Sequence, residues 1–240
     1  MTHFSDGLEV GGAVTNPVVG STGGFGVHTK QLGYLDIDPL TKNATALAAS
    51  QSLGAAGNLA LTAGTSVTTT VDSLGNTRYV LDCARAVTIT SAGIDTGITF
   101  DVSGYDIYGS AMTSTVTGSS ASVATTTKAF ASVTSIYASG ATSSTVTAGT
   151  ADVFGMPIAV LDKAYLDRVG WANTMAQDTG TFTTAVITTA TTSTGDVRGT
   201  YVPSSASNGV NRLVVTIVLS AAQGGFGSAA STSILGVAQA

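Results

Sequence analysis

Charged side chains are scarce in this sequence. Only 10% of its 240 residues are Asp, Glu, Lys or Arg, against the ~25% that is typical of soluble domains. Glutamate occurs once, as Glu9, and five long stretches contain no charged residue: 43–71, 107–127, 129–151, 179–195 and 213–240. Exposed helices ordinarily use Glu, Lys and Arg, which have high helix propensity and form i,i+4 pairs. Their scarcity therefore argues against long exposed helices.

Positive charge and long apolar runs are also lacking. The net charge is −5, whereas nucleic acids and anionic membranes are bound by clusters of Lys and Arg. The strongest apolar run, LVVTIVL at 213–219, is too short to cross a bilayer. The first ten residues contain acidic side chains and no apolar core, unlike a secretory signal. We therefore expect neither nucleic acid nor membrane as a partner, and synthesis in the cytoplasm.

Candidate metal ligands are few and scattered. Cys83 is the only cysteine, which excludes an intrachain disulfide and a multi-cysteine zinc site. His3 and His28 are 25 residues apart without neighbouring cysteines, although a zinc site needs three or four convergent ligands. Asp36 and Asp38 lack the oxygen-rich loop of a calcium site. The sequence therefore predicts no metal site and no cofactor.

Catalytic groups are equally sparse. Cys83 would need a histidine base to act as a nucleophile, and a small buried hydrophobic role is predicted for it instead. The densest charge cluster is interpreted as a solvated hairpin or as a salt-bridge patch between subunits; it comprises Asp162, Lys163, Asp167 and Arg168. The glycine-rich segment 20–26 lacks the lysine of a phosphate-binding loop. We therefore expect no enzyme and no catalytic residues.

Threonine is what the sequence has in abundance, with 40 residues. Its β-branched side chain favours strands. Strand patterns recur at short spacing, and polar turns are expected at 73–76 and 105–109. The predicted strands are 59–61, 67–71, 78–82, 86–90, 98–102, 113–117, 129–137, 144–147, 181–192, 196–202 and 212–219. Many short strands joined by polar turns predict an all-β fold, an antiparallel β-sandwich that is jelly-roll-like.

The stretch 84–104, ARAVTITSAGIDTGITFDVSG, shows the strand pattern most clearly. Val87 and Ile89 alternate with threonines, and Phe100 and Val102 alternate with polar residues after a link of small residues. Alternation with a period of two predicts two half-buried strands. We expect these four apolar side chains to face a core.

Two segments allow more than one interpretation. Residues 44–60 are rich in alanine but contain glycines, so a strand or loop is predicted, with at most one or two helical turns. Residues 156–161 and 165–171 are expected to form a hairpin around a turn at 162–164. Apolar residues of that segment also fit a helical stripe.

Composition divides the chain into three parts. Residues 1–42 hold both histidines and several Gly and Pro residues, and they are interpreted as an extended N-terminal arm. Residues 43–220 are predicted to form the β-sandwich body. A division of this body into two subdomains near residue 152 stays open. Residues 221–240 are an uncharged, low-complexity C-terminal tail.

Several stretches carry a resemblance to a known group of proteins. They are ALAASQSLGAAGNLALTAG (46–64), RAVTITSAGIDTGITFDVSGYDIYGSAMTSTVTG (85–118), TTTKAFASVTSIYASGATSSTVTAGT (125–150) and FGMPIAVLDKAYLDRVGWAN (154–173). In texture and order they resemble β-sandwich structural proteins of tailed bacteriophages, and FSDGLEVGGAV (4–14) looks like the N-terminal arm of capsid-associated phage proteins. The resemblance implies a capsid decoration (cement) protein on the outer surface of the virion head. It also implies the major capsid protein as partner, a homotrimer with a jelly-roll or similar body, and no catalytic residues.

The resemblance also suggests where contacts would lie. Residues 1–35 are expected to make intersubunit contacts. The candidate capsid or intersubunit interface consists of Phe4, Leu8, Val10, Phe25, Trp171 and Phe226. Two alternatives stay open: a phage tail or head-fibre component, and a bacterial adhesin or carbohydrate-binding module, for which strands rich in Thr, Ser and Gly are also typical.

Overall fold

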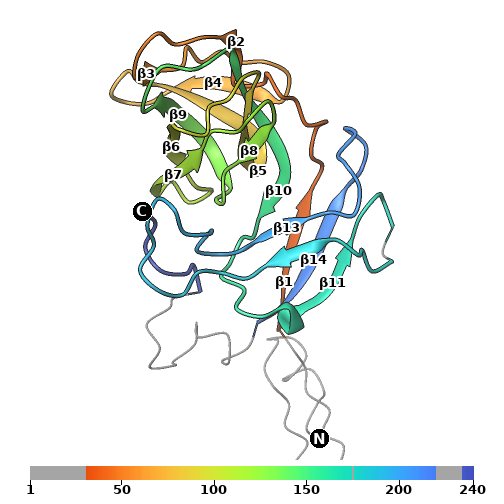
Figure 1. Ribbon diagram of the computed structural model, residues 1–240. Helices are drawn as coiled ribbons and strands as arrows, with labels where there is room; N and C mark the ends of the chain where they lie inside the picture. Colours follow the sequence, from red (N-terminus) through yellow and green to blue (C-terminus); the bar gives the residue numbers. More distant parts are fainter. Residues whose placement is uncertain (1–30, 175, 220–233) are drawn as a thin grey trace, which may run out of the picture.

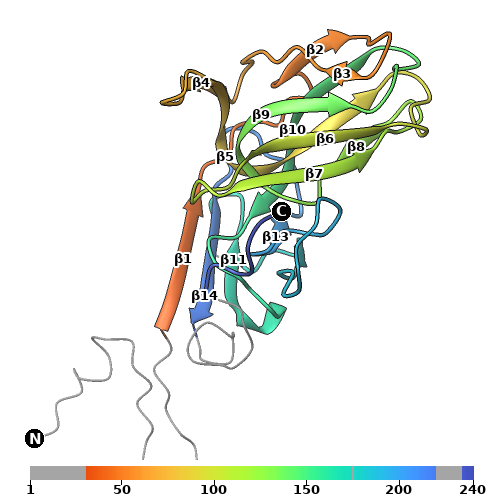
Figure 2. The same ribbon diagram turned by 90° about the vertical axis from the view of Figure 1, so that its left-hand side faces the viewer.

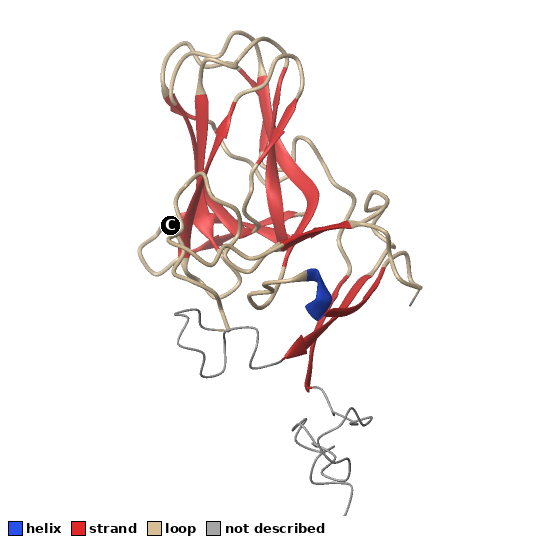
Figure 3. Cartoon of the chain, turned by 60° about the horizontal axis from the view of Figure 1, so that its bottom comes forward, coloured by secondary structure: helices blue, strands red, loops and turns tan. Residues whose placement is uncertain are grey.

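In the computed structural model, residues 31–174, 176–219 and 234–240 are described, and nearly all their regular structure is β-strand (Figure 3). The exception is one 3-10 turn, η1 (Lys163–Tyr165). The strands are β1 (Gln31–Ile37), β2 (Ala48–Gln51), β3 (Gly57–Asn58), β4 (Val67–Val71), β5 (Thr77–Ser91), β6 (Thr99–Tyr105), β7 (Ala111–Thr117), β8 (Val123–Thr125), β9 (Phe130–Ala138), β10 (Val146–Gly155), β11 (Leu166–Gly170), β12 (Thr181–Thr183), β13 (Thr200–Val202) and β14 (Leu213–Leu219). The predicted all-β class is confirmed.

All pairings between these strands are antiparallel, and they form two sheets. The large sheet has the order β12-β13-β10-β5-β9-β6-β7, and β2, β3, β4 and β8 pair alongside β10, β9 and β5. The small sheet has the order β1-β14-β11. The large sheet curls into a sandwich-like arrangement, in which β6, β7 and β9 lie across from β5 and β10 (Figures 1 and 2). The small sheet lies at the other end of the molecule.

The strand β5 organises the large sheet because it is 15 residues long. Its first part pairs with β4 and β9, and its last part lies between β10 and β8. The segments predicted as separate strands at 78–82 and 86–90 therefore form one continuous strand.

The side chains of the stretch 84–104 lie as the alternation predicts. Val87, Ile89, Phe100 and Val102 are fully buried. They belong to a core cluster that also contains Leu47, together with residues from β7, β9 and β10. The two strands of this stretch are not bonded to each other, because β9 lies between β5 and β6 in the sheet.

A second core cluster lies between the small sheet and the lower part of the large one. Phe154, Trp171 and Tyr201 are its aromatic residues, and β14 contributes Leu213, Val215 and Ile217. Leu35 and Ile37 of β1 pack against it. Since β1 belongs to this sheet, residues 31–37 of the predicted arm are part of the folded body.

Several local predictions are wrong. Residues 59–61 contain no strand, and the strand expected at 196–202 is reduced to β13, Thr200–Val202. Residues 156–161 contain no strand, and β11 pairs with β14 rather than with them. The expected turn at 162–164 overlaps the 3-10 turn η1 instead of joining a hairpin. The long strand expected at 181–192 is reduced to β12, three residues that pair with β13. Local β-propensity was high in 181–192, but only strands with a partner edge form.

Candidate functional site

The predicted interface residues fall into two groups. Five of them lie outside the described residues: Phe4, Leu8, Val10, Phe25 and Phe226. The sixth, Trp171, is only 4% exposed. Its Nε1 donates to Ser205 Oγ at 2.9 Å, and its ring centroid lies 6.2 Å from that of Phe154. Trp171 is therefore a core residue, with little surface left to contact another molecule.

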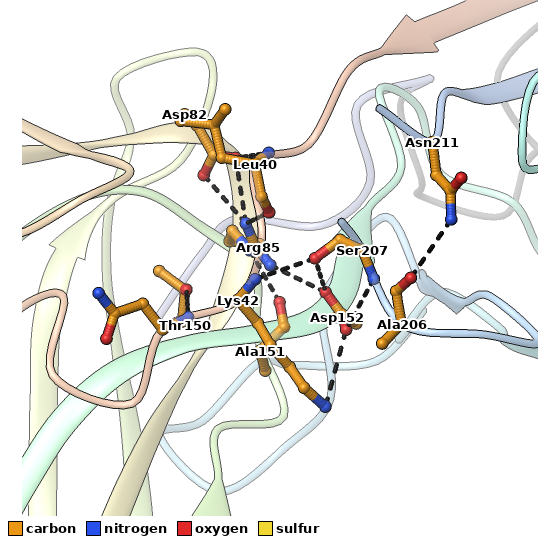
Figure 4. Close-up of polar contacts among 11 residues, drawn as sticks. Leu40, Lys42, Asp82, Arg85, Thr150, Ala151, Asp152, Ala206, Ser207 and Asn211 are labelled. Carbon is orange, nitrogen blue, oxygen red and sulfur yellow. Dashed lines mark hydrogen bonds and ion pairs between the residues drawn. The ribbon is translucent and has the colours of Figure 1, made fainter. Parts of the chain in front are cut away.

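A buried ion-pair cluster surrounds Arg85, whose side chain is fully buried (Figure 4). Its Nη1 lies 3.0 Å from Asp82 Oδ2, and its Nη2 lies 2.9 Å from Asp152 Oδ1. Nε donates to the Ala151 carbonyl at 2.8 Å, and Nη1 donates to the Leu40 carbonyl at 3.1 Å. The guanidinium thus binds β5, β10 and the segment after β1 to one another.

The same cluster extends through Asp152. Its carboxylate accepts hydrogen bonds from the Ser207 hydroxyl at 2.6 Å and from the Ser207 amide at 3.2 Å. Lys42 Nζ lies 3.8 Å away, and the Lys42 amide donates to Ser207 Oγ at 3.0 Å. These groups hydrogen-bond and pair with one another. The cluster therefore connects the strands β5 and β10 to the segments around Lys42 and Ser207.

A second buried pair joins Arg198 to Asp106, with Nη1 and Oδ2 2.9 Å apart. Asp106 Oδ1 also accepts from the amides of Tyr108 and Ser110, at 2.8 Å each. These bonds close the β6–β7 turn that was predicted at 105–109, where Gly109 has a φ of +80°. The pair ties this turn to the segment before β13.

Lys128 and Asp196 are further charged groups inside the protein. Lys128 is fully buried, and its Nζ donates to the Ala240 carbonyl at 2.9 Å. Burial lowers the pKa of Lys128, an effect that Asp196 partly offsets. Burial likewise raises the pKa of Asp196, against the hydrogen bonds that it accepts from the amides of Ala129 and Arg198. The bond from Lys128 holds Ala240 against the body.

The remaining charged candidates have structural contacts. Asp36 of β1 forms a bidentate pair with Arg212, which holds the pKa of that carboxyl below its usual range. Asp162 Oδ1 accepts from the Ala164 amide at 2.8 Å and caps η1. The thiol of Cys83 is half-buried, and burial raises its pKa to about 12. The thiol is therefore protonated at neutral pH, as expected of a packing residue.

The strand β1 presents an exposed edge. Among the described residues it pairs only with β14. Leu32 and Tyr34 are 50% and 60% exposed and lie on the face directed away from the core. The strand contains no lysine and no proline, two residue types that commonly prevent the pairing of an edge with another chain. This edge can therefore accept a further strand.

A polar cleft of about 660 Å³ lies beside the β4–β5 hairpin. It is lined by Asn58, Leu59, Leu61, Asp72, Gly75, Asn76, Thr77, Tyr79, Tyr105, Thr134 and Ser135. Sequence reasoning missed this cleft because its residues come from four strands and from the segments between them.

Comparisons with protein-family models, with curated proteins and with solved structures find no match for this chain. Among the described residues, no group of three or more His, Cys, Asp or Glu side chains is arranged to hold a metal ion. In the same part of the chain, no helix is long and apolar enough to cross a membrane. The described residues thus present two surface features that another molecule could contact, the edge of β1 and the polar cleft.

Proposed function

We propose that this chain is a capsid decoration protein of a tailed bacteriophage. It binds the outer surface of the head as a homotrimer and bridges neighbouring major capsid subunits. It is made in the host cytoplasm and resides in the virion. The resemblance of the stretches 46–64, 85–118 and 125–150 to phage structural proteins supports this function.

The observation that carries the proposal is the exposed edge of β1. An edge strand offers unpaired backbone N–H and C=O groups, to which a strand of a neighbouring subunit can add. The exposed Leu32 and Tyr34 side chains supply apolar anchors beside those groups. The chain leads from β1 directly to the N-terminal interface candidates Phe4, Leu8, Val10 and Phe25. Attachment through β1 and the residues before it accounts for both features.

The internal construction of the body suits a mechanical role. The Arg85 and Arg198 clusters bind together segments that are far apart in the sequence. The charges of both arginines are paired with carboxylates inside the protein. Only 10% of the residues in the sequence are charged, so the surface carries few charges, and such a surface favours association with other subunits. A rigid body that binds its neighbours through the edge of β1 can hold two capsid subunits together.

The test is binding of the full chain to capsids that lack it, measured by co-sedimentation and by electron cryomicroscopy. We expect the full chain to saturate the capsid surface, with three copies around a common axis. A chain lacking residues 1–30, and the double variant Leu32→Ser/Tyr34→Ser, are expected to lose most of this binding.

Leu74→Ser is the matched control, because Leu74 is 83% exposed on the β4–β5 hairpin, away from β1. It is expected to bind as the full chain does. Unchanged occupancy of both β1-end variants, or density for the chain on the tail alone, would overturn the proposal.

A further inference from the structure

The polar cleft lies on rigid elements. Asn58 belongs to β3, Thr77 and Tyr79 to β5, and Thr134 and Ser135 to β9. Its outer wall is the β4–β5 turn, which the Asp72 carboxylate closes by accepting hydrogen bonds from the amides of Leu74 and Asn76. Because the walls are paired strands and a closed turn, the cleft is preformed.

Several polar side chains in the cleft have no partner of their own. Asn58, Thr77 and Ser135 make no side-chain hydrogen bond within the described structure, and Asn58 and Thr77 are exposed. An amide and two hydroxyls can each donate and accept. The cleft therefore offers uncharged hydrogen-bonding groups to a ligand.

Two aromatic rings in the cleft are held in place. The Tyr79 hydroxyl donates to the Leu61 carbonyl at 2.9 Å. The Arg78 guanidinium lies 3.8 Å from the centre of the Tyr105 ring and does not line the cleft. Fixed rings give a ligand apolar contact area at low entropic cost.

The cleft carries one charge, which is largely neutralised. Asp72 is its only ionisable acid, and Arg78 Nη2 lies 3.5 Å from the Asp72 carboxylate. No lysine or arginine is among the lining residues. Phosphate and sulfate groups are ordinarily bound by such cations, so an anionic ligand does not fit this lining.

We propose that this cleft binds a neutral saccharide of one or two pyranose rings. Its volume of about 660 Å³ is within the usual range for small-ligand sites, roughly 300–1,000 Å³. The apolar C–H faces of a sugar can pack on Tyr79 and Tyr105, and its hydroxyls can bond to Asn58, Thr77 and Ser135. The proposal does not depend on attachment to a capsid.

The test uses the full chain on an array of neutral and acidic oligosaccharides, followed by calorimetric titration of the best neutral binder. Asn58→Ala is expected to weaken binding about fivefold, since one hydrogen-bonding side chain is lost. Tyr105→Ala is expected to weaken it about tenfold or more, and Tyr105→Phe, which keeps the ring, much less.

Asn211→Ala is the matched control, because Asn211 precedes β14, does not line the cleft, and has a side chain that donates one hydrogen bond, to the Ala206 carbonyl at 3.3 Å. It is expected to leave saccharide affinity unchanged. Asn58 is exposed, so its variant tests the cleft even if Tyr105→Ala impairs folding. Absence of any neutral ligand on the array, binding of acidic glycans alone, or equal affinity of Asn58→Ala and the parent chain would overturn the proposal.

Discussion

At the scale of single residues, this chain places several of its few charges inside the protein. Arg85, Arg198, Lys128, Asp106 and Asp196 are all less than 5% exposed. A buried charge is costly unless it is paired and hydrogen-bonded. Arg85, Arg198 and Asp106 are in ion pairs, whereas Lys128 and Asp196 form hydrogen bonds with backbone groups. Arg85 is the most demanding case, because its side chain is fully buried between two carboxylates.

Replacement of Arg85 by methionine is expected to lower the free energy of unfolding by about 3–5 kcal/mol. The Asp82 and Asp152 carboxylates would remain at the junction without their guanidinium partner. Urea unfolding followed by Trp171 fluorescence measures the loss. The control Arg212→Met removes the exposed partner of Asp36 and should cost much less, because water screens that pair. Equal losses in the two variants would contradict the importance of burial.

At the scale of elements, the close approach of two backbone segments requires glycine at one position in β10. Gly149 lies against residues 43 and 44, and a Cβ at this position would overlap the Asn43 carbonyl oxygen and the backbone of Ala44. The Thr150 amide donates to that same carbonyl at 2.9 Å, and the Asn43 amide donates to Thr150 Oγ1 at 3.0 Å. Glycine is needed here for space rather than for an unusual φ.

Gly149→Ala is therefore expected to separate β10 from residue 43 and to lower the free energy of unfolding by about 1–3 kcal/mol. Gly97→Ala is the matched control, since nothing lies within 4 Å of the Cβ that it would add. Thermal unfolding of the two variants, followed by circular dichroism, compares them. A midpoint for Gly149→Ala as high as that of Gly97→Ala would show that the strand can move at no cost.

At the scale of the whole molecule, two hydrophobic cores are joined by continuous strands. In β10, Val146 and Ala148 belong to the first cluster and Phe154 to the second. In β5, Leu81 belongs to the first cluster, and Cys83 packs against the second. The Arg85 cluster lies at the junction between them. Neither core can unfold without breaking strands of the other.

We therefore expect the chain to unfold in one cooperative transition. Trp171 fluorescence reports on the second cluster, and hydrogen exchange of the β6 and β7 amides reports on the first. Phe100→Ala, which removes a fully buried ring from the first cluster, should shift both probes together and cost about 3–5 kcal/mol. Separate midpoints for the two probes would show that the cores are independent domains.

The sequence alone determined the fold class and the inward side chains of its most regular strands. Threonine content, missing charge and period-two alternation are local properties, and Val87, Ile89, Phe100 and Val102 are buried as they predict. The turns at 73–76 and 105–109 were also predictable, because Asp72 and Asp106 close them through bonds to amides two and four residues ahead.

Only the tertiary structure decided which strands pair and where the functional features lie. The segments 156–161 and 181–192 had strand-like composition, but most of their residues have no neighbouring strand to pair with. Residues 31–37 form a strand because they pair with β14. Arg198 and Asp106 are 92 residues apart in sequence, and the residues of the polar cleft span Asn58 to Ser135. No spacing rule brings such residues together, because their proximity results from the curl of the large sheet and from its packing against the small one.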